Sequence, residues 1–341
     1  MHPALLSENL SNSTVRCNIC QWRCTIHSDK TGVCRMYRNI QGELYNLNYA
    51  LVSSVAVDPI EKKPLFHFYP GTKVYSLGGW GCNFHCEDCQ NWEISMVEDV
   101  LAGSKEISPQ NAIETAKRYN CAGIAWTYNE PSMWFEYTLD CAKLAKQNHL
   151  YTVYVTNGYL SPEALDTIGP YLDAWRVDIK GFSDSLYRNL AGITNWRVIL
   201  DVAQRAKKKW NMHLEVVTNI VPTMNDDDEQ LAGIARWINN ELGSDTPWHV
   251  TRFHPNYRIA DLPATPLATL EHAYTLGRLA GLKFVYLGNV PGHFSETTVC
   301  SSCGKPVVER TGYQTVVSGL KGSCCQFCGA DLNFRVDRGG K

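Results

Sequence analysis

The middle of the chain alternates short apolar runs with longer segments of helical periodicity. The runs are rich in Val, Ile, Tyr and Trp, and several are apolar nearly throughout. This pattern is typical of strands buried on both faces of a parallel sheet. It predicts strands at residues 74–78, 122–128, 151–156, 174–180, 214–221, 248–253 and 283–289.

Residues that can cap a helix stand between the predicted strands. Ser108-Pro109 and Ser161-Pro162 each offer an N-cap hydroxyl followed by proline at the first helical position. Asn225 is expected to cap another helix, with the acidic residues 226–229 at the positive helix end. The repeated strand–loop–helix units predict parallel βαβ topology.

Two α/β architectures fit this repeat, a doubly wound sheet and a barrel. Polar and glycine-containing motifs follow many of the strands, and in a barrel such loops meet at one rim, where active sites are built. We therefore predict a complete or partial TIM-like (β/α) barrel over residues 71–294. An N-terminal segment with a four-cysteine module (residues 1–70) precedes it, and a zinc-ribbon-like module (residues 295–341) follows it.

Composition narrows the class of protein. Hydrophobic residues make up 44% and charged residues 19%, which argues against disorder. A net charge of −2 lacks the broad basic field of a dedicated nucleic-acid binder, so a nucleic-acid partner is not expected. No cationic N-terminal region precedes a long apolar stretch, and no run approaches about 18 apolar residues. Neither a signal peptide nor a membrane span is therefore expected.

The 14 cysteines are the strongest indication of the chemistry of this protein. Most of them fall in three tight clusters, and spacings of two or three residues suit ligands of one metal better than disulfides between distant segments. In a long chain without an export signal, this pattern predicts a cytoplasmic protein with metal sites. Cys121 and Cys141 lie in apolar surroundings and are expected to be buried hydrophobic residues.

The central cluster follows the first predicted barrel strand. Cys82, Cys86 and Cys89 form a C-x3-C-x2-C pattern. Three thiolates can hold three irons of a [4Fe–4S] cube and leave the fourth iron open to another ligand. Spacing alone leaves two alternatives, a catalytic zinc held by three thiolates and water, and a closed site completed by His85.

The flanking clusters each contain four cysteines. Cys300, Cys303, Cys325 and Cys328 form two C-x2-C-G knuckles around a β-like stretch, residues 307–317, which is the spacing of a zinc ribbon. The C-x2-C-G match selects Cys325 over its neighbour Cys324. Zinc is the metal most often bound by four cysteines in a small module, and an auxiliary iron–sulfur cluster is the alternative for the N-terminal set. Spacing does not decide between them. That set is Cys17, Cys20, Cys24 and Cys34.

Longer motifs carry a resemblance to a known family. Residues 57–95, WTYNEPSMWFEY (126–137), VTNGYL (155–160), VDIKGF (177–182) and the terminal CSSCG and CQFCG occur in the expected order over nearly the whole chain. They resemble the radical S-adenosylmethionine (SAM) enzyme of the AmmeMemoRadiSam system, which is related to pyruvate formate-lyase activating enzymes.

The resemblance implies a function and partners. SAM would bind the open iron and be cleaved by one electron, and the resulting 5′-deoxyadenosyl radical would abstract hydrogen from a small-molecule or protein substrate. An electron donor such as flavodoxin or ferredoxin is implied, together with Memo-like and Amme-type proteins. Two other functions stay open, an activating enzyme for a glycyl-radical protein and, from another class, a zinc-ribbon adaptor with an inactive barrel.

The resemblance also implies SAM contacts, each with a structural alternative. Asn129 and Glu130 would accept hydrogen bonds from the SAM amino group, and the alternative is a helix cap. Asn157 would be a polar SAM contact or an Asn-Gly turn. Asp178 and Lys180 share one strand face and would lie near SAM or form a salt bridge. His249 would lie near the ribose or be a buried structural histidine.

One position departs from the superfamily pattern. Asp88 stands where an aromatic residue often packs against adenine, and Phe84 or Trp92 would have to supply that contact instead. Asp88 and its neighbour Glu87 are also expected to lower the potential of a cluster beside them if they are ionised.

Overall fold

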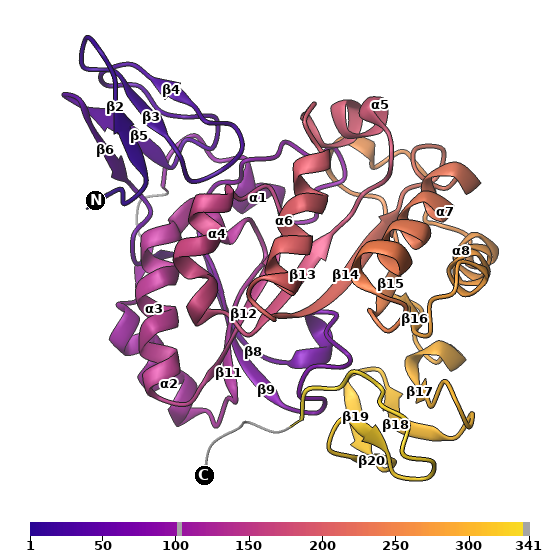
Figure 1. The fold of residues 1–341 in the computed structure, drawn as a ribbon. Helices are drawn as coiled ribbons and strands as arrows, with labels where there is room; N and C mark the ends of the chain where they lie inside the picture. The colour runs from indigo at the N-terminus through magenta and orange to yellow at the C-terminus, as the bar shows by residue number, and fades with distance from the viewer. Residues whose placement is uncertain (101–103, 337–341) are drawn as a thin grey trace. The chain divides into compact units, whose positions relative to one another are not determined.

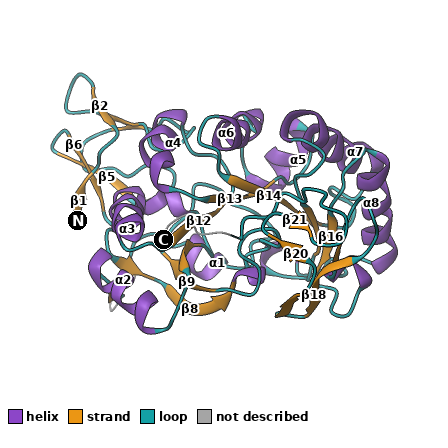
Figure 2. Ribbon diagram, turned by 60° about the horizontal axis from the view of Figure 1, so that its bottom comes forward, coloured by secondary structure: helices purple, strands orange, loops and turns teal. Residues whose placement is uncertain are grey.

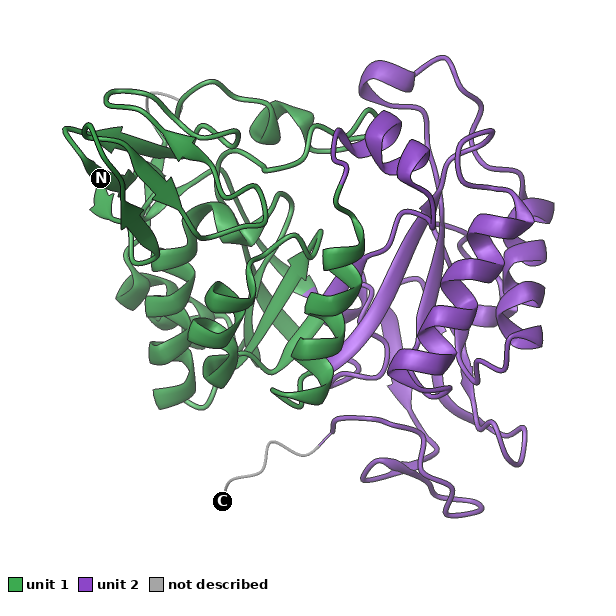
Figure 3. Cartoon of the chain, turned by 45° about the horizontal axis from the view of Figure 1, so that its top comes forward, with its two compact units in different colours: residues 1–58, 73–175, 195–212 green, residues 59–72, 176–194, 213–341 purple. Residues whose placement is uncertain are grey.

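The computed structural model describes residues 1–100 and 104–336 (Figure 1). The chain divides into two compact units, which Figure 3 colours separately. Unit 1 consists of residues 1–58, 73–175 and 195–212, and unit 2 of residues 59–72, 176–194 and 213–341. This division differs from the three expected modules, because the barrel segment contributes to both units. Residues 337–341 of the expected C-terminal module lie outside the described residues.

Unit 1 contains a set of parallel strands. Strand β9 (Lys73–Gly78) pairs with β11 (Gly123–Trp126), which pairs with β12 (Tyr151–Thr156). Strand β8 (Ser54–Pro59) neighbours β9. All residues of β11 and β12 are buried, as expected from their apolar sequence. Gly123 is required at the start of β11, because a Cβ atom there would stand 2.0 Å from the Tyr151 ring.

Helices of unit 1 follow these strands, and α2, α3 and α4 lie along one side of β11 and β12 (Figure 1). The Ser108 hydroxyl caps α2 by accepting from Asn111 N at 3.2 Å, and Ser161 caps α4 by accepting from Ala164 N at 3.1 Å, which confirms both predicted caps. The helices are α1 (Trp92–Ser95), α2 (Pro109–Arg118), η2 (Pro131–Trp134), α3 (Phe135–Gln147), α4 (Pro162–Ile168), η3 (Gly169–Tyr171) and α6 (Arg197–Lys208).

The N-terminal segment of unit 1 forms small antiparallel sheets. One joins β1 (His2–Pro3), β6 (Glu43–Asn46) and β5 (Tyr37–Ile40) in that order, and the second joins β2 (Ser7–Asn9), β3 (Val15–Cys17) and β4 (Thr25–Ile26). Strand β7 (Leu51–Val52) pairs with β10 (Lys105–Glu106). The four N-terminal cysteines therefore belong to a β-rich, loop-dominated part of the chain.

Unit 2 contains the later parallel strands. Strand β14 (His213–Ile220) pairs with β15 (Trp248–Arg252), which pairs with β16 (Val285–Gly288). Strand β13 (Ala174–Asp178) begins in unit 1 and ends in unit 2. Helices α7 and α8 pack beside each other (Figure 2). The helices are η1 (Ile60–Lys62), α5 (Asp184–Leu186), η4 (Tyr187–Ala191), α7 (Asp228–Trp237), η5 (Ile238–Leu242), η6 (Tyr257–Ile259), α8 (Leu267–Leu279) and η7 (Phe294–Glu296).

The predicted cap of α7 was wrong by two residues. Asp227 is the N-cap, and its side chain accepts from Gln230 N at 3.0 Å. Asn225 instead accepts from Val221 N at 2.7 Å and donates to Lys180 O at 2.7 Å. Its amide therefore closes the loop after β14 and fastens it to the end of β13, because only an amide both accepts and donates here.

The C-terminal module of unit 2 is built from short strands. Strands β17 (Thr298–Val299), β18 (Pro306–Thr311) and β19 (Gln314–Val317) form one sheet, and β20 (Leu320–Lys321) pairs with β21 (Cys324–Cys325). The β-like stretch between the two cysteine knuckles is thus the β18–β19 hairpin. Val307, Val308, Leu332 and Phe334 form one buried apolar cluster with Tyr286 of β16, which anchors the module.

All seven predicted strands are present, with ends shifted by a few residues. Their mostly parallel pairing within each unit is consistent with a partial barrel. No helix in residues 1–100 and 104–336 is long and apolar enough to cross a membrane.

Candidate functional site

The three central cysteines lie on the loop after β9. Their side chains have intermediate exposure. Burial raises the pKa of the Cys82 thiol well above its usual value, and the charges of Cys86, Glu130 and Cys89 raise it further. Thiolates crowded in this way repel one another, and a bound metal centre removes that repulsion because a coordinating thiol is deprotonated outright.

A glycine brings this loop close to the N-terminal segment. Gly81 has φ = 74°, and a Cβ atom there would stand 2.5 Å from Met36 Cγ and 2.8 Å from Cys34 O. No other residue fits this position without displacing the backbone around Cys34. Phe84 N donates to Cys82 Sγ at 3.5 Å. The Phe84 ring packs edge-on against Tyr159.

Asn157 reaches the cysteine loop from the end of β12. Its Nδ2 lies 2.7 Å from Asn83 Oδ1 and 3.9 Å from Cys82 Sγ. Gly158 has φ = 76°, so the Asn-Gly turn that was the alternative is also present. The predicted SAM contact therefore stands directly beside the first cysteine.

Glu130 is buried, and its carboxylate accepts hydrogen bonds from its own loop and from the end of β12. Its carboxylate accepts from Ser132 N at 3.2 Å, Ser132 Oγ at 2.7 Å, Thr156 Oγ1 at 2.8 Å and Asn157 N at 2.9 Å. Burial raises the pKa of the Glu130 carboxyl, and these donors offset part of that rise. Glu130 caps η2, which was the structural alternative to its predicted SAM contact. Its hydrogen bonds also hold Thr156 and Asn157 in position.

Asn129 offers what Glu130 does not, an open acceptor. Its Nδ2 donates to Gly81 O at 2.6 Å, while its buried Oδ1 finds no hydrogen-bond partner among the described residues. A buried acceptor without a partner costs free energy unless something else satisfies it. An ammonium-like donor at the cysteine loop would do so.

Asp178 and Lys180 belong to unit 2. Asp178 forms an ion pair with Arg176, which lies two residues earlier on the same strand face and was not singled out from the sequence. Lys180 N donates to Tyr187 OH at 3.0 Å. The signal for Arg176 was its two-residue spacing from Asp178.

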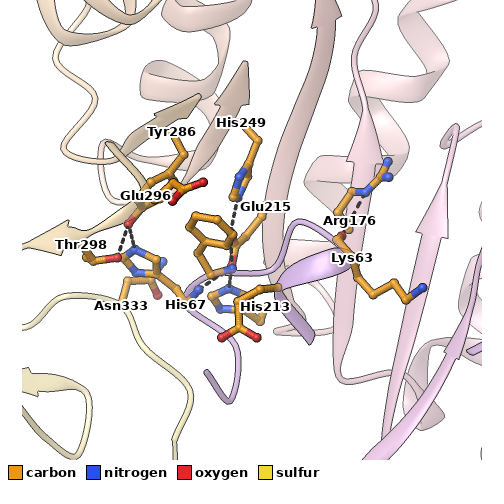
Figure 4. Close-up of polar contacts among 12 residues, drawn as sticks. Lys63, His67, Arg176, His213, Glu215, His249, Tyr286, Glu296, Thr298 and Asn333 are labelled. Atoms are coloured by element: carbon orange, nitrogen blue, oxygen red, sulfur yellow. Dashed lines mark hydrogen bonds and ion pairs between the residues drawn. The ribbon is translucent and has the colours of Figure 1, made fainter. Parts of the chain in front are cut away.

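His249 lies in a buried polar network of unit 2 (Figure 4). Its Nε2 stands 2.6 Å from Glu215, which also accepts from His213 Nε2 at 2.9 Å and from the backbone N–H of His67 at 2.8 Å. Burial opposes ionisation of Glu215, but the hydrogen bonds from His213 and His249 outweigh it and hold the pKa well below its usual value. Sequence reasoning missed Glu215, whose only signal was the His-x-Glu spacing on one strand face.

The C-terminal cysteines form a compact four-sulfur group. The ligand atoms of Cys300, Cys303, Cys325 and Cys328 lie within 4.8 Å of one another, with 3.6 Å between Cys300 and Cys328 and 3.7 Å between Cys303 and Cys325. A tetrahedral zinc with Zn–S bonds of about 2.3 Å holds its sulfurs about 3.8 Å apart. The group therefore fits zinc, and Cys325 rather than Cys324 takes part in it.

The N-terminal cysteines are also gathered. Cys17, Cys20 and Cys34 are buried and Cys24 is partly exposed. Burial raises the pKa of the Cys34 thiol to about 11 and that of Cys17 well above its usual value. The charges of Cys20, Cys24 and Cys34 add to the shift of Cys17, and that of Cys24 adds to the shift of Cys34, so a metal centre would relieve repulsion in this set too.

Comparison with known proteins places these sites in context. The family model described as the Radical SAM superfamily matches residues 79–238, which include the three central cysteines. The chain is 42% identical over 336 residues to the uncharacterized protein MJ0808 of Methanocaldococcus jannaschii, covering 98% of this chain and 99% of that protein. It is 23% identical over 160 residues to the pyruvate formate-lyase 1-activating enzyme of Escherichia coli, covering 44% of this chain and 61% of that enzyme.

A solved structure supports the fold alone. A radical SAM methyltransferase from Sphaerobacter thermophilus matches with a TM-score of 0.51 at 13% identity, covering 70% of this chain and 71% of that one.

Proposed function

Because this chain is an enzyme of the radical SAM superfamily, we propose that Cys82, Cys86 and Cys89 hold three irons of a [4Fe–4S] cluster whose fourth iron binds SAM. One observation carries the proposal. The charges of Cys86 and Cys89 raise the pKa of the Cys82 thiol, and Asn129, on the loop after β11, donates to Gly81 O and leaves its buried Oδ1 without a partner among the described residues. The site therefore suits both a cation centre and a hydrogen-bond donor. A cluster with bound SAM supplies both.

The residues of unit 1 fit such a centre. When bound, the cluster supplies one electron that cleaves SAM to methionine and a 5′-deoxyadenosyl radical, which abstracts hydrogen from the substrate. Asn129 Oδ1 accepts from the SAM amino group. Glu130 does not touch SAM in this proposal. It positions Asn157, which donates toward the Cys82 sulfur.

The SAM contacts proposed in unit 2 are Asp178, Lys180 and His249. Asp178 forms an ion pair with Arg176. On the family resemblance, Lys180 is the cation we assign to the SAM carboxylate. The described contacts of His249 are with Glu215, Phe66 and Tyr286, which fit the structural alternative as well as a place near the ribose.

The C-terminal cysteines are proposed to hold a structural zinc ion. Their sulfur separations support this, because they match one tetrahedral ion. Four thiolates close the coordination shell, so the ion has no position for substrate.

The proposed partners follow from the resemblance. They are SAM, a one-electron donor such as flavodoxin or ferredoxin, an unidentified substrate, and the Memo-like and Amme-type proteins of the AmmeMemoRadiSam system. The second candidate function, activation of a glycyl-radical protein, has the similarity to the Escherichia coli activating enzyme in its favour. Membership of an enzyme class leaves the non-catalytic adaptor without support.

The test is anaerobic reconstitution with iron and sulfide, followed by incubation with SAM and dithionite. We expect a cluster absorption band and formation of 5′-deoxyadenosine in the wild type, and loss of 5′-deoxyadenosine formation in the Cys86→Ala variant. A single zinc ion enclosed by the three cysteines and His85 in a structure determined without oxygen would end the proposal.

A further inference from the structure

The three cysteine sets differ in how closely their sulfur atoms approach. In residues 1–100 and 104–336, only the C-terminal set has its ligand atoms all within 4.8 Å of one another. One zinc ion requires that approach, because its four sulfurs lie about 3.8 Å apart. In a [4Fe–4S] cube each cysteine binds a different iron, so the sulfurs stand further apart. Among the described residues, neither the central nor the N-terminal set has three of its ligand atoms within 4.8 Å of one another.

The N-terminal set is nevertheless one group. Every one of its pairings shows an electrostatic interaction between the two thiols. The backbone holds the group together, because Cys17 N donates to Cys24 O at 2.9 Å and Gly32 N donates to Tyr37 O at 3.0 Å, which closes the turn around Cys34. Four gathered thiols without the separation of a zinc site provide one ligand for each iron of a cube.

This group touches the loop of the central cysteines on both sides of Cys82. On one side, Gly81 packs against Cys34 O. On the other, Asn83 O accepts from Trp22 Nε1 at 2.8 Å. The Asn83 side chain is fully buried, and Asn157 donates to its Oδ1. Its Nδ2 has no hydrogen-bond partner among the described residues, and the Asn83 side chain opposes the rise in the pKa of the Cys20 thiol. Through its backbone carbonyl, Asn83 therefore links the loop of the central cysteines to Trp22 of the N-terminal segment.

We propose that Cys17, Cys20, Cys24 and Cys34 bind a second [4Fe–4S] cluster that passes electrons to the central one. A one-electron carrier of the flavodoxin or ferredoxin class reduces the N-terminal cluster by one electron. That electron then reduces the central cluster, and the N-terminal cluster returns to its oxidised state. Binding of the second cluster is independent of the proposed function, whereas the electron transfer rests on it.

The binding test uses metal analysis of the anaerobically reconstituted full chain. We expect about eight irons and one zinc per chain. A Cys82→Ala, Cys86→Ala, Cys89→Ala variant should retain about four irons with the Mössbauer signature of a [4Fe–4S] cluster. A Cys20→Ala, Cys34→Ala variant should lose about half of the wild-type iron and keep its zinc.

Two results would overturn binding, and both can be obtained even if the Cys20→Ala, Cys34→Ala variant does not fold. One is about four irons with about two zincs in the wild type, and the other is a central triple variant that holds no iron. If instead the central site binds no cluster, the wild type and the triple variant hold equal iron. Failure of the proposed function is thus distinguishable from failure of this inference.

Electron transfer is tested by electron paramagnetic resonance of the fully reduced protein. Two clusters held by these adjoining segments should broaden each other's signals, and the broadening should vanish in the central triple variant. Spectra that equal the sum of two separate clusters would refute the transfer step. Addition of SAM should change only the signal of the central cluster, which is the signal absent from the central triple variant.

Discussion

At the scale of single residues, Asn129 is the sharpest test of SAM binding. Replacing it with leucine removes a buried amide oxygen beside the cysteine loop that has no hydrogen-bond partner among the described residues. A hydrogen bond to a charged donor contributes about 1.5–3 kcal/mol, so we expect the Kd for SAM to rise about tenfold to a hundredfold with cluster content unchanged. Isothermal titration with SAM measures this.

Asn91 offers the matched control for Asn129. Its Nδ2 donates to Tyr128 O at 2.7 Å, so Asn91→Leu also removes a side-chain hydrogen bond from this loop. If both variants weaken SAM binding equally, Asn129 has only a structural role.

Asp88 lies between two of the proposed cluster ligands and is buried. A carboxylate there opposes the arrival of an electron, and Asp88→Asn removes the charge with little change of shape. We expect the midpoint potential of the central cluster to rise by an amount on the order of tens of millivolts. Redox titration of the two proteins side by side measures it, and equal midpoints would contradict the argument.

The residues that sequence reasoning found and missed differ in one physical respect. The cysteines could be predicted because their ligand spacing is local in the chain. Asn83 and Glu215 could not, because the partners that give them meaning come from distant segments. Glu215 lies on β14, and one of its donors is His67, 148 residues away in sequence. Such a residue has no local pattern.

At the scale of elements, strands were predicted better than helix starts. The strands are buried on both faces, so their apolar runs are unambiguous. The α7 cap was misplaced because Asn225 and Asp227 are both good capping residues two positions apart. Which of the two residues caps the helix depends on a tertiary contact, because the Asn225 amide donates to Lys180 O. A local sequence pattern does not reveal that contact.

Strand β21 gives a prediction with a built-in control. It places Cys325 in the four-sulfur group and leaves its neighbour Cys324 outside it. Cys325→Ser should lose the C-terminal zinc and lower the Tm, because a structural zinc contributes directly to folding. Cys324→Ser should keep both. Zinc analysis and calorimetry measure these, and zinc loss only in Cys324→Ser would reverse the assignment.

At the scale of the whole molecule, the division into units was not predictable from the sequence. Segment 59–72 precedes β9 in the chain, yet it belongs to unit 2. Glu215 holds it there through the N–H groups of Phe66 and His67, and Arg310 donates to Phe66 O at 2.7 Å. His67 Nδ1 stands 2.9 Å from Leu332 O, and its Nε2 stands 2.6 Å from Tyr286 OH. Five segments that are distant in sequence thus meet at one buried polar network.

This network predicts how the stability of unit 2 depends on pH. Burial lowers the pKa of His67 to about 3 and also lowers that of His249. Their unfolded pKa is about 6.5, so the unfolded chain gains protons below that pH while the folded chain does not. The stability contributed by neutral His67 is complete above pH 6.5 and is lost as pH falls below it. The pKa of Glu215 is lowered as well, so its contribution is lost only in more acidic solution.

The expected loss from His67 alone between pH 7 and pH 5 is about 2 kcal/mol of unfolding free energy. His67→Gln removes this titration, so urea unfolding of the variant should show a shallower pH slope than the wild type, even if the variant is less stable throughout. His254 is exposed, and His254→Gln should leave the slope unchanged. Protonation of the metal-binding cysteines acts equally on all three proteins, so only the difference in slope reports the buried histidine. Equal slopes in wild type and His67→Gln would show that His67 takes up its proton in the folded state, which would contradict the lowered pKa.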